Sequence, residues 1–441
     1  MRWTTEGAHA VIASVASGFE EFDAVDSPHG PDGPLSWPGY GVARKEAAVR
    51  SGTNEAVVCG RGTVGSVPAV LIAFDFRFLG GSVGSATGTR IVDAFGRARA
   101  AGLPVVSLIA TGGTRMQEGM LSLRQLQAIV GEAVRTPTPH VAVLRDPATG
   151  GVWASLGAGA DVVLAERGAQ VGFAGRRVRP AADADDPAYT AEGQYAAGHV
   201  DEVVAEPREP LAAWLALLSG GSSAPVPAPV PRALGSLTPP PSGWDAVRHA
   251  RAAARPRAAA YLDDYFTARR AIRGDRAGGV DEGMLCGIGW HDGRAVAYAA
   301  QAGTATTPAG YRTASRLVRL ADRLGLPVLT LVDTPGAAAS PAAELAGAGP
   351  AIAELFATIA AARVPVTTLV IGEGGSGGAL ALCSPDRLWI APDAYFSVIA
   401  PELAAAILKR DPGSVPELAG QLRLRPAELL ELGVVRGIAT R

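Results

Sequence analysis

Short apolar runs alternate with amphipathic stretches along both halves of the chain. In the first half, residues 67–76, 105–109 and 141–144 are almost entirely apolar, which is typical of buried strands. Residues 94–101 instead place apolar side chains at helical spacing. Each apolar run leads into a glycine turn and then into a helix. This alternation predicts an α/β fold.

The two halves repeat each other. Residues 102–113 read GLPVVSLIATGG and residues 325–336 read GLPVLTLVDTPG, an offset of 325 − 102 = 223. The segments Thr149-Gly-Gly-Val and Ser376-Gly-Gly-Ala match at an offset of 376 − 149 = 227. Matching features in the same order indicate that one unit has been duplicated.

A proline-rich stretch separates the repeats. Residues 219–242 contain APVPAPVP and TPPP, which cannot continue a helix or a sheet and predict an extended, semi-rigid linker. We therefore expect two domains, at residues 36–218 and 243–441. Residues 1–35 become Gly-, Pro- and Asp-rich toward their end and are expected to form a loosely packed N-terminal extension.

Composition narrows the function classes. The 441 residues give room for two domains, and 48% of them are apolar. A net charge of −2 offers no bulk field to nucleic acid or to an anionic membrane. Cys59, Cys286 and Cys383 lie far apart without a CxxC motif, so neither a disulfide framework nor a zinc cluster is expected. With no apolar run of membrane-spanning length, a cytoplasmic protein is predicted.

Glycine pairs follow the same strand in each half. Gly150 and Gly151 lie between the strand at 141–144 and a helix expected at 153–157, and the second half carries GEGGSGGA at 372–379 before a helix expected from Leu380. Such glycines let the backbone approach a ligand, and their N–H groups concentrate positive potential where an oxyanion can sit. The second turn lacks the Lys-Ser/Thr of a P-loop. Tight strand-to-helix packing remains the alternative.

Side-chain chemistry is sparse. The six histidines have no metal-ligand spacing. Asp75, Asp333 and Glu373 are candidate acids, although the sequence favours a role in ordering a turn or capping a helix over that of a base for each of them. Two backbone oxyanion holes without a side-chain base favour enolate chemistry in which the substrates supply the base.

Several longer motifs are specific enough to compare with a known family. They are FLGGSVGS at 78–85, TGGTRMQEGMLSL at 111–123, DPATGGV at 146–152, VGFAG at 171–175, DTPGA at 333–337 and YFSVIAPE at 395–402. With these motifs, the sequence resembles the fused β–α carboxyltransferase of bacterial acetyl-CoA or acyl-CoA carboxylase over about residues 35–205 and 243–440. The resemblance implies two tandem crotonase-like domains built from repeated β-β-α units.

The resemblance also assigns roles. It implies that the first half binds the acyl-CoA thioester, with Gly150 and Gly151 stabilising its enolate. The second half would bind carboxybiotin, with Gly377, Gly378 and Ala379 at the ureido oxygen. The turn glycines expected to contact the cofactor and CoA are Gly112, Gly113, Gly336 and Gly375. Arg115 and Arg90 are expected near the CoA phosphates, and a plain solvated surface role stays open for each.

Partners follow from the same resemblance. Because no biotinylation site or ATP-binding domain occurs in the sequence, a separate biotin carboxylase and biotin carboxyl carrier protein are expected. The family's site forms between the first half of one protomer and the second half of another, which implies a dimer-based homo-oligomer. No zinc is expected, because residues 1–50 lack the cysteines of the family's zinc ribbon. A biotin-independent decarboxylase and a non-catalytic scaffold remain alternative functions.

Overall fold

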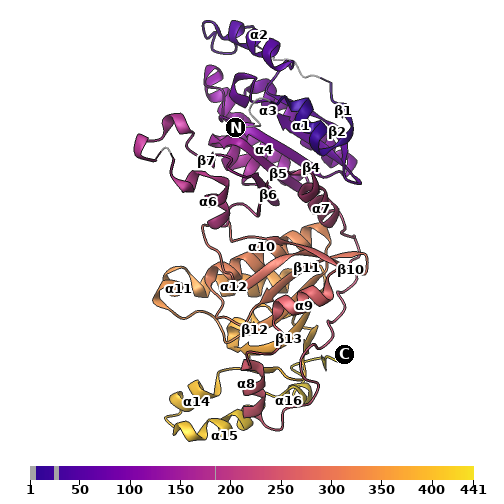
Figure 1. Ribbon diagram of the computed structural model, residues 1–441, viewed down its shortest axis with the longest axis vertical. Helices are drawn as coiled ribbons and strands as arrows, with labels where there is room; N and C mark the ends of the chain where they lie inside the picture. Colours follow the sequence, from indigo (N-terminus) through magenta and orange to yellow (C-terminus); the bar gives the residue numbers. More distant parts are fainter. Residues whose placement is uncertain (1–5, 24–28, 184) are drawn as a thin grey trace. The chain divides into compact units, whose positions relative to one another are not determined.

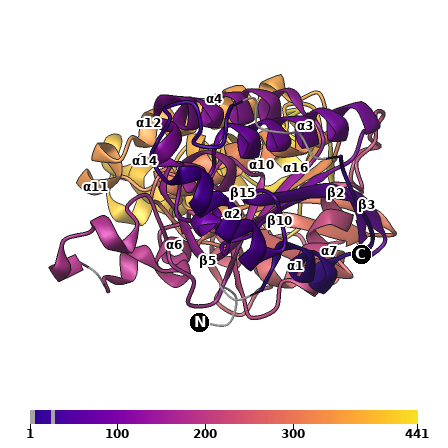
Figure 2. The ribbon, with the colours of Figure 1, turned by 90° about the horizontal axis from the view of Figure 1, so that it is seen from above.

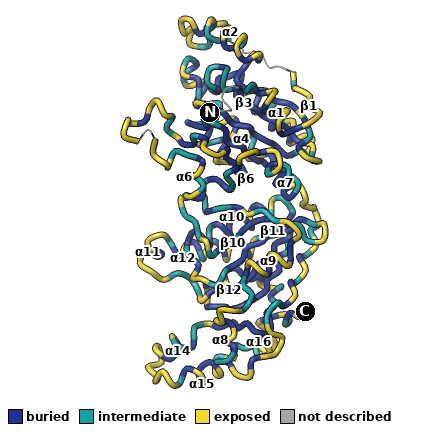
Figure 3. Tube along the Cα trace, viewed as in Figure 1, coloured by how far each residue is buried: buried dark blue, intermediate teal, exposed yellow. Residues whose placement is uncertain are grey.

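The computed structural model describes residues 6–23, 29–183 and 185–441. The chain divides into two compact units, Met1–Ser219 and Gly220–Arg441, and each is described by itself (Figure 1). In each unit the central strands are buried and most of the exposed residues lie on helices and loops (Figure 3). No helix in the described ranges combines the length and apolar character needed to cross a membrane.

The first unit is built on one mixed sheet with the strand order β1-β2-β3-β4-β5-β6-β8, and β7 pairs with the end of β5. β1, β2 and β3 pair antiparallel with one another, whereas the pairs from β3 to β8 are parallel. Parallel neighbours need long crossovers, and helices supply them here. The strands are β1 Ser17–Glu21, β2 Val57–Val64, β3 Val67–Phe74, β4 Val105–Thr111, β5 His140–Thr149, β6 Val162–Glu166, β7 Val171–Gly172 and β8 Glu202–Val204.

Helices cover both faces of this sheet. α3 and α4 pack together over one face, and α1 and α7 cover the other (Figure 2). The α-helices are α1 Ala8–Val15, α2 Tyr40–Ser51, α3 Ser85–Ala101, α4 Gly119–Arg135, α5 Gly150–Val152, α6 Ala191–Ala196 and α7 Arg208–Leu218. A π-helical turn, Trp153–Gly157, continues α5, and short 3-10 turns lie at Leu79–Gly81, Met116–Glu118, Arg176–Val178, Ala181–Asp183 and Pro187–Tyr189.

The second unit repeats this topology. Its sheet has the order β16-β14-β13-β12-β11-β10-β9, with β15 paired to the end of β13. β9, β10 and β11 are antiparallel neighbours and the remaining pairs are parallel. The strands are β9 Ala268–Ile272, β10 Met284–His291, β11 Arg294–Gln301, β12 Val328–Thr334, β13 Val366–Gly375, β14 Leu388–Ile390, β15 Tyr395–Ser397 and β16 Gly437–Ile438.

The helices of the second unit bury apolar side chains against its sheet. α10 contacts β10, β11 and α12, and the buried side chains of α9 join those of β11 in one core cluster. The helices are α8 Gly243–Arg251, α9 Ala258–Tyr265, α10 Pro308–Leu324, α11 Pro341–Leu345, α12 Ala348–Ala361, α13 Ser376–Leu380, α14 Pro401–Ile407, α15 Val415–Gln421 and α16 Pro426–Glu431, with a 3-10 turn at Pro412–Ser414.

Strand pairing corrects the register of the glycine pairs by one residue. Thr111 of β4 pairs with Ala148 of β5, and Thr334 of β12 pairs with Gly374 of β13. The offset of β13 from β5 is therefore 374 − 148 = 226, not 227. Gly150 consequently corresponds to Ser376, and Gly151 to Gly377.

The expected element ends at the turns were also wrong. β5 continues to Thr149 and β13 to Gly375, because their last residues pair with β7 and β15. The helix expected from Leu380 begins at Ser376 and ends at Leu380. α3 begins at Ser85, nine residues before the expected 94, since 94 − 85 = 9. In α13 the glycines that suggested a turn, Gly377 and Gly378, lie inside the helix.

Part of the predicted N-terminal extension belongs to the first unit's core. Val11, Ile12 and Val15 of α1 are buried, and β1 extends the sheet by pairing with β2. α1 and β1 precede β2 as α9 and β9 precede β10. The expectation of loose packing is therefore wrong for these two elements, while residues 1–5 and 24–28 lie outside the described ranges.

The proline-rich segment is extended, but it is packed along the second unit. No helix or strand occurs in the described residues 220–242. The Ala228 carbonyl accepts a hydrogen bond from Thr367 Oγ1 at 2.9 Å, and the Pro229 carbonyl accepts one from Tyr265 Oη at 2.9 Å. Ala228 and Ala233 are buried in the core cluster of this unit. The segment thus serves as a covering layer of the second unit.

Candidate active site

The turn from β5 into α5 brings two backbone segments into close contact. Gly150 has a φ of +73°, and a Cβ built on it would lie 3.0 Å from the Cα of Gly113. Its N–H donates to the Phe173 carbonyl at 3.1 Å. Only glycine combines this left-handed φ with such a close approach. Because its N–H group already donates to a carbonyl of the protein, Gly150 has no free amide for a ligand.

The loop after β4 is fastened to residues 80–83 by backbone hydrogen bonds. The Gly112 N–H donates to the Gly80 carbonyl at 2.8 Å, and the Val83 N–H donates to the Gly113 carbonyl at 2.9 Å. The Gly113 N–H donates to Thr111 Oγ1 at 3.0 Å. The predicted glycines Gly112 and Gly113 therefore shape the loop, and their own amides are occupied.

Two N–H groups of the first unit remain available for a ligand. Within the described residues, neither the Gly151 N–H nor the Thr114 N–H has a hydrogen-bond acceptor. Gly151 is in the first turn of α5, where amides lack intrahelical partners, and Thr114 follows Gly113 directly. Thr114 was not predicted from the sequence, because a backbone amide leaves no trace in the residue type.

The second unit repeats the arrangement. The Gly336 N–H donates to Thr334 Oγ1 at 3.1 Å, and the Thr306 N–H donates to the Gly336 carbonyl at 3.1 Å. In the described part of this unit, the N–H groups of Ala337 and Gly377 have no acceptor. A Cβ built on Gly377 would meet no atom within 4 Å. Gly377 therefore borders open space, and Ala337 is a second residue that sequence reasoning missed.

The carbonyl of Gly378 is held by two buried side chains. It accepts hydrogen bonds from Tyr311 Oη at 3.1 Å and Gln301 Nε2 at 3.2 Å. A Cβ on Gly378 would collide with the backbone nitrogen of Ala337 and one on Gly375 with the Pro335 carbonyl. Close backbone packing thus explains these two glycines. Ala379, also predicted for the site, is fully buried in α13.

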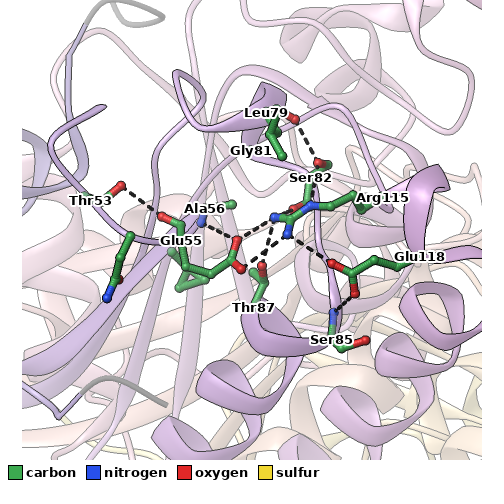
Figure 4. A network of polar contacts seen from close by, with 12 residues as sticks. Thr53, Glu55, Ala56, Leu79, Gly81, Ser82, Ser85, Thr87, Arg115 and Glu118 are labelled. Carbon is green, nitrogen blue, oxygen red and sulfur yellow. Dashed lines mark hydrogen bonds and ion pairs between the residues drawn. The ribbon is translucent and has the colours of Figure 1, made fainter. Parts of the chain in front are cut away.

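The structure does not support the predictions for Arg115 and Arg90. Arg115 is 2% exposed and forms ion pairs with Glu55 at 2.5 Å and with Glu118 at 3.3 Å (Figure 4). Arg90 is 9% exposed and donates to Asn54 Oδ1 at 2.9 Å. Neither side chain lies on a solvated surface. Burial of the Arg115 guanidinium between two carboxylates also argues against a phosphate contact.

The three candidate acids are held by structural partners. Asp75 is fully buried, accepts the Arg77 N–H at 3.0 Å and pairs with the Arg77 guanidinium at 2.8 Å. It therefore orders a turn. Asp333 is also fully buried, and it pairs with Arg255 at 2.5 Å and with Arg257 at 3.2 Å.

Glu373 is held in the same way. Its Oε1 pairs with Arg251 at 2.9 Å and accepts the Tyr395 hydroxyl at 2.5 Å. Each of the three acids, Asp75, Asp333 and Glu373, is thus engaged in an ion pair with an arginine. Among the described residues, no group of three or more His, Cys, Asp or Glu side chains could hold a metal ion.

Family comparisons match both units. Residues 39–203 match the family described as carboxyl transferase domain. Residues 236–440 match the family described as acetyl co-enzyme A carboxylase carboxyltransferase-like. Each match falls within one of the two compact units.

Whole-chain comparisons agree. The chain is 43% identical over 429 residues to the acetyl-coenzyme A carboxylase carboxyl transferase subunits beta/alpha of Salinispora tropica, covering 89% of this chain and 74% of that protein. The corresponding protein of Saccharopolyspora erythraea is 41% identical over 459 residues, covering 98% of this chain and 80% of its own length.

Solved structures share the fold. The 12S transcarboxylase with hydrolysed methylmalonyl-coenzyme A bound superposes with a TM-score of 0.81 at 21% identity, covering 99% of this chain and 87% of that one. With the paired units and the two family matches, these comparisons show that the chain belongs to the acetyl-CoA carboxylase carboxyltransferase family.

Proposed function

We propose that this enzyme is the carboxyltransferase component of a biotin-dependent acyl-CoA carboxylase. It would move a carboxyl group from carboxybiotin to the α-carbon of acetyl-CoA, or of a related acyl-CoA, to give malonyl-CoA or its homologue. The observation that carries this proposal is the pair of equivalent turns, one in each unit. Each turn has backbone N–H groups without an acceptor among the described residues.

The first unit's amides suit a thioester. When the α-proton of an acyl-CoA is removed, negative charge develops on the thioester oxygen. The N–H groups of Gly151 and Thr114 would stabilise that oxygen without any reorganisation, because both are fixed by the backbone. Gly151 also begins α5, where first-turn N–H groups carry partial positive charge.

The second unit's amides suit the ureido oxygen of biotin. The open space at Gly377 admits a ligand, and the N–H groups of Gly377 and Ala337 would hold a carbonyl oxygen there. Carboxybiotin supplies the carboxyl group and, after releasing it, the base for the α-proton. Asp75, Asp333 and Glu373 are engaged in ion pairs, which agrees with a reaction that needs no side-chain base.

The proposal includes partner proteins. A separate biotin carboxylase would load biotin, and a biotin carboxyl carrier protein would deliver it. A second copy of this chain would cover an apolar face of α4, whose exposed side chains recur at helical spacing. On α4 these side chains, 39–80% exposed, are Met120, Leu123, Val130 and Val134, and exposed Met116 lies in the 3-10 turn just before this helix.

The reverse reaction tests this function. Purified protein is incubated with malonyl-CoA in the presence and absence of free biocytin, and acetyl-CoA is measured. We expect acetyl-CoA to form only when biocytin is present. Equal formation without biocytin would instead identify a biotin-independent decarboxylase. If a panel of longer malonyl-type thioesters also gave no turnover, the catalytic proposal would be wrong.

A further inference from the structure

A buried charge network contacts residues 82–83, the segment to which the loop after β4 is hydrogen-bonded. The Arg115 guanidinium contacts two carboxylates: its Nη2 donates to Glu55 Oε1 at 2.5 Å, and its Nη1 lies 3.3 Å from Glu118 Oε1 (Figure 4). Tyr40 of α2 completes the network, because its hydroxyl donates to Glu118 Oε1 at 2.5 Å. All four side chains are buried, so removal of any one partner would leave a polar group unsatisfied.

Both carboxylates remain ionised in this setting. Burial opposes the charge of Glu55, but Arg115 and the Ala56 N–H hold its pKa below the usual value. Burial likewise opposes the charge of Glu118, while hydrogen bonds from Tyr40 and the Ser85 N–H lower its pKa. The Glu118 carboxylate accepts the N–H of Ser85, the first residue of α3, and the dipole of that helix favours a negative charge there.

The network fixes the loop that carries Thr114. Arg115 Nη2 donates to the Ser82 carbonyl at 2.8 Å, and the Arg115 N–H donates to the Val83 carbonyl at 2.9 Å. The Val83 N–H in turn donates to the Gly113 carbonyl. The side chain and the backbone of Arg115 therefore bind the same segment, residues 82–83, and they hold Gly113 and Thr114 between them.

The second unit shows that the fold does not require this network. With the offset of 223 between β4 and β12, Arg115 and Glu118 correspond to Ala338 and Pro341, and the same backbone bonds form without them. The N-terminus of α10 is capped instead by Asp281, whose Oδ2 accepts the Thr307 N–H at 2.7 Å. The buried network is thus an addition specific to the first unit.

We propose that Arg115 is a positioning residue for carboxyl transfer, acting through the Glu55–Arg115–Glu118 network to align the Thr114 N–H with the thioester oxygen. This inference rests on the proposed function. It replaces the expectation that Arg115 binds a CoA phosphate. In this proposal Glu55 and Glu118 hold the Arg115 side chain in place.

The test uses Arg115→Lys and Glu118→Gln, with Arg97→Lys as the matched control. Arg97 pairs with Asp93 at 2.7 Å on the exposed face of α3. Biocytin-dependent decarboxylation is measured with malonyl-CoA and with malonyl-pantetheine, which lacks the nucleotide phosphates. We expect both network variants to lower kcat by roughly 10- to 100-fold with either substrate, the range associated with one misaligned donor. The Kd for CoA should change less than about twofold, and the control should match the wild type.

Three results would overturn the inference. A loss confined to malonyl-CoA, together with a raised Kd for CoA, would make Arg115 a phosphate ligand. Unchanged kcat in variants that melt at lower temperature would give the network a purely structural role. Full activity and unchanged melting would remove any role for it. A wild-type protein inactive with every thioester would instead overturn the proposed function, and this inference with it.

Discussion

Ser376 adopts a left-handed backbone conformation in the position where the first unit has Gly150. Its φ is +58°, whereas that of Gly150 is +73°. A side chain in this region costs roughly 1 kcal/mol relative to glycine. The same turn is therefore relaxed in one unit and strained in the other.

We predict that Ser376→Gly stabilises the second unit by about 1 kcal/mol and keeps biocytin-dependent activity. Chemical denaturation followed by tryptophan fluorescence measures the stability. Ser414→Gly is the matched control, because Ser414 has a φ of −79° and should lose stability on the same change. No gain at Ser376 would show that the strain is absent.

At the residue scale, the sequence singled out the strand-to-helix turns, but not every residue there whose N–H group lacks an acceptor among the described residues. Gly150, Gly151 and Gly377 lie at the helix starts where glycine repeats suggested an oxyanion site. Thr114 and Ala337 were missed, because their contribution is a backbone N–H. Arg115 was expected near a CoA phosphate or on a solvated surface, but its side chain is buried. The sequence could not indicate this, because its partner Glu55 lies 60 residues away along the chain.

A buried ion pair joins β5 and β6 in the first unit. Arg145 and Glu166 lie 3.7 Å apart and are 1% and 3% exposed. Burial raises the pKa of Glu166 from 4.5 to about 7, and the charge of Arg145 only partly opposes this. Because the folded state then binds a proton that the unfolded state releases, stability from this group falls as pH rises from 4.5 to 7.

We predict that the wild type loses up to about 3 kcal/mol of stability relative to Glu166→Gln between pH 5 and pH 8. Urea denaturation at a series of pH values measures the difference. Glu46→Gln, at an exposed site on α2, should leave the slope unchanged. Parallel curves for the wild type and Glu166→Gln would contradict the raised pKa.

At the element scale, periodicity predicted strands better than their ends. β3 and β4 appear close to the expected ranges 67–76 and 105–109, because long apolar runs define them. The N-terminal α1 and β1 were not predicted. Of the five residues of β1, Phe19 alone has a large apolar side chain, and two glutamates end the strand, because this edge strand exposes most of its side chains. The ends of β5 and β13 were predicted too early, because the glycines near them were interpreted as turn residues.

Apolar side chains exposed along α4 bear on assembly. Val134 is 80% exposed at one end of this face. If a second copy covers the face, a charge there would be buried without a partner. We predict that Val134→Glu lowers the apparent mass in sedimentation velocity toward that of one 44.9 kDa chain.

Val49→Glu is the control for this experiment. Val49 is 87% exposed on α2, a different helix, and the same charge there should leave the mass unchanged. An unchanged mass for Val134→Glu, or an equal shift for both variants, would contradict self-association through α4.

For the whole molecule, duplication was the most informative property of the sequence. The repeat predicted two equivalent sheets, and both have the same strand order. A one-residue register error nevertheless shifted the second glycine pair, because the segments between strands differ in length and the offset changes from 227 to 223 and then to 226. Only pairing between strands resolves such shifts.

The central claim is that each unit contributes one amide-lined turn to a single reaction. The most direct measurement is biocytin-dependent decarboxylation of malonyl-CoA by Gly151→Val and Gly377→Val. At Gly377 a Cβ meets no atom, and at Gly151 it meets only the Leu126 Cδ1 end of a side chain, at 2.5 Å, so both variants should fold. Melting temperatures check this.

We expect either change to lower turnover by about 100-fold or more, because the added side chain occupies the space beside an oxyanion donor. Loss in Gly151→Val alone would restrict the chemistry to the first unit. Full activity in both folded variants would contradict the claim that these two turns take part in the reaction.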